Sequence, residues 1–125
     1  MHLKNTGTMN NLKNKVNLIG RLGAKPEMRK VGEKGYALTR FSLAINESYK
    51  DKVSGEWKNN TVWHSITAWG KTAEKMCESL DKGTEIALEG KLVQKEYELK
   101  DGTKRSSVEV EVNDFMMIQR TKTIN

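Results

Sequence analysis

The 125-residue sequence contains a single cysteine, Cys77, which excludes an intrachain disulfide and a zinc site built from several cysteines. A lone cysteine fits a reducing compartment, and we expect Cys77 to be an apolar helix residue and not a reactive thiol. No apolar run approaches the length that spans a bilayer, and the N-terminus lacks the hydrophobic region of a signal peptide. These absences predict a cytoplasmic protein that does not contact a membrane.

The sequence also lacks the patterns on which most enzymes depend. It has no Walker motif and no GxGxxG, and its only histidines, His2 and His64, form no metal-binding set with acidic residues. His64 falls on an apolar strand face, where a hydrogen-bonded structural histidine is favoured over a general base. Gly20 and Gly23 match the GXXG loop of KH domains, but the pattern lacks the helices that such a domain needs. We expect no catalytic residue, metal or cofactor, and a nuclease remains only as an alternative.

Acidic residues are outnumbered by basic ones, and this imbalance points to a class of partner. The chain has 22 lysines and arginines against 16 aspartates and glutamates, which gives a net charge of +6 and a pI of about 9.4. Such an excess favours a polyanion, although basic charge also serves solubility. Charge alone therefore does not decide between nucleic acid and no partner.

Five segments alternate apolar and polar residues with the period of a strand, and one segment has the period of a helix. The predicted strands span residues 15–22, 36–45, 61–69, 84–98 and 107–118. Between the third and the fourth, a short helix is predicted by the apolar stripe of Ala73, Met76, Cys77 and Leu80. Gly83 lies where the glycine that ends a helix is expected. This order predicts an all-β fold, a five-stranded OB-fold barrel with one short helix between strands 3 and 4 and long protruding hairpin loops.

The length suits one compact domain. We expect a flexible N-terminal arm at residues 1–13, the OB-fold domain at residues 14–119 and a short basic C-terminal end at residues 120–125. Within the domain, residues 47–60 are charged and polar and form either a long loop or a splayed hairpin tip.

Two tryptophans occupy the polar face of a predicted strand. Trp63 and Trp69 are six residues apart, so a regular strand places both on one face. Val62 and Ile66 on the opposite face make the better core. Exposed rings suit stacked bases, because every base has a π-face. The alternative is that the pair packs against a neighbouring subunit or under a loop.

Tyrosines and basic residues extend this pattern. Tyr97 follows Lys95 on a non-core face, and Tyr49 precedes Lys50 in the polar segment. Rings bind bases while cations neutralise phosphates, so the combination predicts a groove for single-stranded nucleic acid. Trp57 is either a further ring of this groove or a cap of the loop. The predicted groove cations are Lys15, Arg40, Lys50, Lys52, Lys71, Lys91 and Lys95.

Several motifs resemble, in order, those of bacterial-type single-stranded DNA-binding proteins. The matching segments are NKVNLIGRLGAKPE at residues 14–27, FSLA and ESY within 41–49, WH and WGKTAE within 63–74, KG at 82–83 and LEGKL at 88–92. The resemblance covers about residues 14–119 and is more specific than any one motif. It implies an OB-fold, sequence-independent binding of single-stranded DNA, and a role in replication, recombination and repair at a bacterial nucleoid.

The resemblance also implies particular residues. The four base-stacking positions of the family correspond to Tyr49, Trp63, Trp69 and Tyr97. Two are tyrosine where better-known members have tryptophan, and one is tryptophan where phenylalanine is common, so every position keeps a ring. Family members usually form homotetramers in which first strands pair between subunits, with a dimer as the alternative here. The expected interface residues are Val16, Leu18 and His64.

The C-terminal end departs from the family pattern. Such proteins usually end in an acidic, hydrophobic tip that recruits replication and repair enzymes, whereas residues 119–125 are basic and short. We therefore expect either that the protein lacks recruitment through that tip or that the tail has been removed. The departure supports a second hypothesis, a dimeric relative similar to the primosomal replication protein, which bridges a helicase to DNA.

Overall fold

The computed structural model describes residues 13–119. The predicted N-terminal arm up to residue 12 and the basic end from residue 120 lie outside the described residues. The elements are β1 (Val16–Leu22), β2 (Glu27–Val31), β3 (Tyr36–Lys50), β4 (Trp57–Trp69), α2 (Gly70–Ser79), β5 (Glu85–Glu98) and β6 (Lys104–Met117).

Five of these strands close into a small barrel. The strand order is β1-β5-β6-β4-β3-β2, and the barrel closes where Arg21 and Leu22 of β1 pair with Ala44 and Leu43 of β3. The helix α2 lies between β4 and β5 in the sequence. The predicted all-β OB-fold barrel with one short helix is therefore confirmed.

The strand β2 is not predicted by the sequence pattern. It pairs with β3 in a hairpin from Glu27 opposite Arg40 to Val31 opposite Tyr36. Four of its five residues are exposed, so it lacks the apolar alternation by which a half-buried strand is recognised. The hairpin places further basic residues beside β3.

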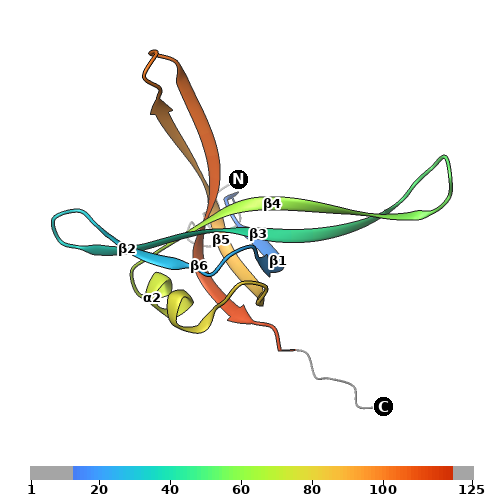
Figure 1. The fold of residues 1–125 in the computed structure, drawn as a ribbon, viewed down its shortest axis with the longest axis horizontal. Helices are drawn as coiled ribbons and strands as arrows, with labels where there is room; N and C mark the ends of the chain where they lie inside the picture. Colours follow the sequence, from blue (N-terminus) through green and yellow to red (C-terminus); the bar gives the residue numbers. More distant parts are fainter. Residues whose placement is uncertain (1–12, 120–125) are drawn as a thin grey trace, which may run out of the picture.

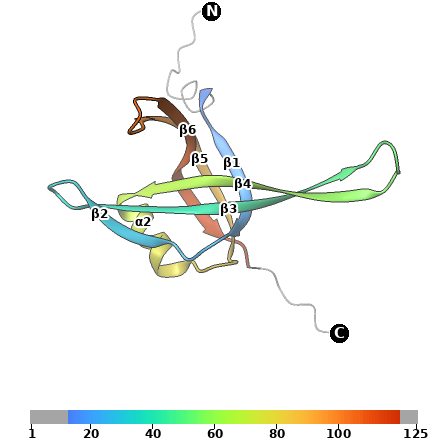
Figure 2. The same cartoon turned by 45° about the horizontal axis from the view of Figure 1, so that its top comes forward.

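Long hairpins project from the barrel. β3 and β4 leave it as a long two-stranded ribbon, and the β5–β6 hairpin projects in a different direction (Figures 1 and 2). Pairing in the ribbon continues from Leu38 opposite Trp69 to Lys50 opposite Trp57. Most of residues 47–60 therefore form a hairpin, and the interpretation as a long loop is wrong. Protruding hairpins give a small domain a large surface for a partner.

The core follows the alternation of the barrel strands. Phe41 and Leu43 of β3 point inward and meet Ile66 of β4, and α2 packs against them with Ala73 and Met76. Every buried side-chain nitrogen or oxygen within residues 13–119 has a hydrogen-bond partner. Because the buried polar groups are hydrogen-bonded inside the barrel, the polar and aromatic residues of the outer face are available for binding.

A glycine allows β5 and β6 to bend sharply. The register between these strands shifts between Glu89 and Gly90, where a β-bulge lies. A Cβ atom at Gly90 would lie 2.3 Å from the backbone carbonyl oxygen of Glu111, closer than real contacts allow. Bulges and glycines are the usual devices that curve a strand at a barrel corner. Here the bend directs the β5–β6 hairpin away from the barrel.

Candidate nucleic-acid interface

Three tryptophans share one face of β4. They are Trp57, Trp63 and Trp69, spaced at six-residue intervals. Along an extended strand, each interval corresponds to about 20 Å. Trp63 is 59% exposed and Trp69 38% exposed, while Ile66 and Ala68 of the opposite face are buried. No loop of the described chain seals the two rings from solvent. The pleat also brings Trp57, which is more exposed still, onto their face.

Trp63 rests against a glycine of another segment. A Cβ at Gly23 would come within 2.7 Å of Cζ3 of the Trp63 indole. The Gly23 amide donates a 2.8 Å hydrogen bond to the carbonyl of Ser42, which fixes this backbone beside β3. This contact was not predicted from the sequence. Its only local signal is the glycine pair Gly20 and Gly23. The absence of a side chain at Gly23 therefore leaves room for the Trp63 indole, which remains largely exposed.

The two tyrosines lie on the projecting hairpins and not beside the tryptophans. Tyr49 of β3 is opposite Lys58, so the pleat puts it on the other face of the ribbon from Trp57. Tyr97 of β5 is opposite Arg105 in the second hairpin. Each is about half exposed. The four predicted rings are therefore all accessible, but the structure gathers only Trp63 and Trp69 on one surface.

The predicted cations divide into free and paired groups. Arg40 and Lys95 both form ion pairs with Glu109, and Lys15 forms one with Glu89 on the β1–β5 side of the barrel. The remaining four form no ion pair within residues 13–119: Lys50, Lys52, Lys71 and Lys91. Lys50 is opposite Trp57 in the ribbon. Lys15 thus lies on the β1–β5 side of the barrel, while Lys71 lies on α2.

Three residues that sequence reasoning missed, Arg29, Tyr36 and Leu38, lie near Trp69. Leu38 is the β3 partner of Trp69, and Arg29 of β2 is opposite Leu38 on its other side. Tyr36 precedes Leu38 by two residues on the same face and is exposed. A shallow hollow between β2 and β3 is lined in part by Arg29, Leu38 and Arg40. This arrangement was missed because β2 is polar and shows no apolar alternation.

Glu109 is a partly buried acid on the tryptophan face. Its carboxylate accepts a 2.6 Å hydrogen bond from Oγ1 of Thr67 and lies 3.8 Å from Arg40 and 3.5 Å from Lys95. Burial acts to raise the pKa of Glu109, but the Thr67 hydrogen bond and the two cations outweigh it and hold the pKa below its usual value. Thr67 lies between Trp63 and Trp69 on their face of β4, yet it is buried and donates its hydroxyl hydrogen to this carboxylate.

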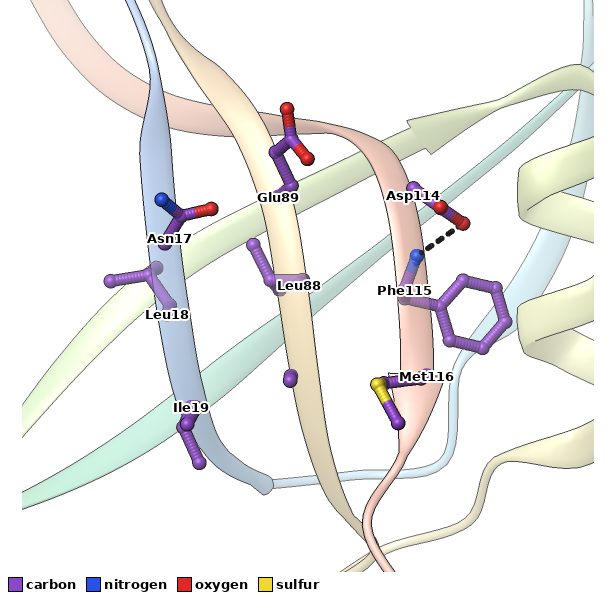
Figure 3. A pocket seen from close by; sticks show the side chains of 9 residues that line it. Asn17, Leu18, Ile19, Leu88, Glu89, Asp114, Phe115 and Met116 are labelled. Carbon is purple, nitrogen blue, oxygen red and sulfur yellow. Dashed lines mark hydrogen bonds between the residues drawn. The ribbon is translucent and has the colours of Figure 1, made fainter.

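A second, apolar surface lies on the outside of β1, β5 and β6. Ile19, Ala87 and Met116 are opposite one another across these strands and line a hollow, which Figure 3 shows. The expected interface residues Val16 and Leu18 are partly buried against the core. His64 is also partly buried. Between Val16 and Gly20, the edge of β1 away from β5 has no strand partner within residues 13–119.

Two classes of feature are absent from the part of the chain that the structure describes. No three histidine, cysteine, aspartate or glutamate side chains gather as a metal site in residues 13–119. In the same residues no helix is long and apolar enough to cross a bilayer.

The family is decided by a match over most of the chain. The sequence profile of the single-strand binding protein family matches residues 13–118. The chain belongs to this family. Members of the single-strand binding protein family bind single-stranded DNA and are not enzymes, so both expectations hold and the nuclease alternative is wrong.

Solved structures of single-strand binding proteins resemble this fold. One is the Plasmodium falciparum protein in complex with single-stranded DNA, with a TM-score of 0.75, 27% identity, and coverage of 95% of this chain and 100% of that chain. Another is a deletion mutant of the Thermus aquaticus single-stranded DNA-binding protein, with a TM-score of 0.74 and 34% identity. That match covers 85% of this chain and 50% of the Thermus chain, so this chain spans about half of its length.

Proposed function

We propose that this single-strand binding protein coats single-stranded DNA without sequence preference, by stacking bases on rings and pairing phosphates with lysines and arginines. The observation that most supports the proposal is the exposure of Trp63 and Trp69 on one barrel face that is otherwise polar. Stacking tolerates any base, and charge neutralisation reads no sequence. We also propose that it protects exposed strands in replication, recombination and repair, at the nucleoid in a bacterial cytoplasm.

The hairpins extend the proposed binding surface. Tyr49 and Tyr97 offer rings away from the barrel, and Trp57 adds a ring in line with the two barrel tryptophans. Lys50 lies directly opposite Trp57, so ring and charge are adjacent there. A strand that follows these rings would wrap the domain and not occupy a single cleft.

Intrinsic tryptophan fluorescence titrated with oligo-dT tests the proposal. Stacking should quench the emission, and a duplex of the same length should bind far more weakly, because its bases are not free to stack. A lack of quenching together with equal affinity for duplex and single strand would remove the proposal.

Salt should weaken the binding steeply. Four predicted groove cations lack an ion-pair partner within residues 13–119, and single strands lose about 0.7 of a counterion per neutralised phosphate. We expect log Kd to rise with log salt with a slope of about 2.8, or roughly 50-fold between 50 and 200 mM NaCl. Fluorescence titrations at four salt concentrations measure this slope. An affinity that is independent of salt would contradict the role of the lysines.

Gly23→Ala should weaken binding by displacing the Trp63 ring. The added methyl group collides with the indole, so we expect roughly a threefold to tenfold loss of oligo-dT affinity with little change in Tm. The same substitution in a Trp63→Ala background should cost nothing further, because the ring is gone. An equal loss in both backgrounds would show that Gly23 acts on the barrel and not through Trp63.

We also propose a homo-oligomer, a tetramer, built on the β1 side of the barrel. The free edge of β1 can add a second strand, and the hollow lined by Ile19 and Met116 offers an apolar face for a further copy. Light scattering with and without a long dT oligonucleotide gives the subunit number and the stoichiometry. A dimer would instead favour the bridging relative as the closer functional parallel.

A further inference from the structure

A line of polar side chains crosses the tryptophan face and divides it in two. The line consists of Lys95 on β5, Glu109 on β6, Thr67 on β4 and Arg40 on β3, and these four strands are neighbours in the sheet. Glu109 is its centre, since it contacts all three of the others. We call this set the Glu109 cluster.

The cluster lies between the two tryptophan positions. Thr67 occurs between Trp63 and Trp69 on the same face of β4, and it is tied to the Glu109 carboxylate. β6 runs parallel to β4 and antiparallel to β5, so Tyr97 falls on the Trp63 side of the line. Any strand that stacks on both Trp63 and Trp69 must therefore pass over the Glu109 cluster.

The cluster also restrains two of the cations. The side chain of Glu109 is only 11% exposed, whereas those of Arg40 and Lys95 are 52% and 35% exposed. The acid therefore lies beneath the two cations, and both heads remain within reach of a strand that passes above. Its Thr67 hydrogen bond keeps the carboxylate in place when the cations move, because the donor is on a barrel strand.

We propose that Glu109 is an attenuator of DNA binding: its carboxylate neutralises Arg40 and Lys95 in the free protein and competes for them with the phosphates of the bound strand. This inference rests on the proposed function. Each cation that exchanges Glu109 for a phosphate gains one ionic contact and loses another, so it contributes little to affinity. The face keeps its cations ordered without the full attraction that two free charges would exert on DNA.

Glu109→Gln tests the attenuation directly. The amide oxygen can still accept the Thr67 hydrogen bond, so the fold is retained, but Arg40 and Lys95 become free charges. We expect tighter binding of oligo-dT. The slope of log Kd plotted against log salt should become steeper by about 1.4, because two further phosphates are neutralised and each contributes about 0.7. The matched control is Glu78→Gln, which removes the same charge from an exposed position on α2, has no ion pair in the described residues and should leave the slope unchanged.

Lysine substitutions in the natural background provide a second test. Lys95→Gln should lower the salt slope much less than Lys50→Gln, because Lys50 is opposite Trp57 and forms no ion pair within residues 13–119. The inference is overturned if Glu109→Gln matches Glu78→Gln, if it binds more weakly than the natural protein, or if the two lysine variants lose equal slope. Failure of the unmodified protein to bind oligo-dT would instead remove the proposed function itself.

Discussion

Replacing Trp63 and Trp69 together by alanine is expected to lower the affinity for oligo-dT by about 2–6 kcal/mol, or at least roughly 30-fold. Each stacked base contributes about 1–3 kcal/mol. The two rings are about 20 Å apart on β4, so their contributions should add. Fluorescence anisotropy of a labelled oligonucleotide measures the loss, since it does not depend on the protein's own tryptophans.

The control for this pair is Trp63→Phe, which keeps a ring. It should bind within a few-fold of the natural protein, because phenylalanine still offers a face to a base. Tm should fall little in the Trp63 variants, since that ring is largely exposed. Unchanged affinity after loss of both indoles, in a folded protein, would mean that the barrel face is not where bases stack.

Gly90→Ala is expected to have the largest effect on stability, a loss of about 3 kcal/mol. The new Cβ would meet the Glu111 carbonyl oxygen at 2.3 Å, and that atom belongs to backbone that cannot rotate away. Overpacking of a fixed neighbour typically costs about 1–3 kcal/mol and sometimes more. Denaturant unfolding followed by circular dichroism gives the difference in free energy.

Lys91→Ala is the matched substitution for the Gly90 prediction. Lys91 is the next residue of β5 and is exposed, so its truncation should change the free energy of unfolding by less than about 0.5 kcal/mol. If Gly90→Ala and Lys91→Ala unfold at the same denaturant concentration, the close approach at the bulge is relieved by movement of β5 and does not constrain the barrel.

The sequence predicted what short-range periodicity can show. Alternation located the five barrel strands, a helical stripe of apolar residues located the helix, and the six-residue interval between Trp63 and Trp69 placed both rings on one face. These signals are local, because the side-chain direction of a strand depends on its own pleat. The exposed rings follow directly from that pattern.

What escaped prediction depends on register between distant segments. The contact between Gly23 and Trp63 joins two segments that are 40 residues apart, and the hydrogen bond from Thr67 to Glu109 joins two that are 42 apart. Neither pairing has a local signature, so Glu109 was indistinguishable from any other acid on a strand. Arg40 and Lys95 were correctly placed on the outer face, but their shared partner was invisible.

Photocrosslinking with an oligo-dT that contains 5-iodouracil tests the central claim most directly, because the reaction reports which side chains lie against bases. Peptide mass spectrometry of the crosslinked protein should identify Trp63 and Trp69, with Tyr97 and Tyr49 on the hairpins. Crosslinks confined to α2 or to the hollow between β1 and β6, with none at the tryptophans of β4, would contradict the account.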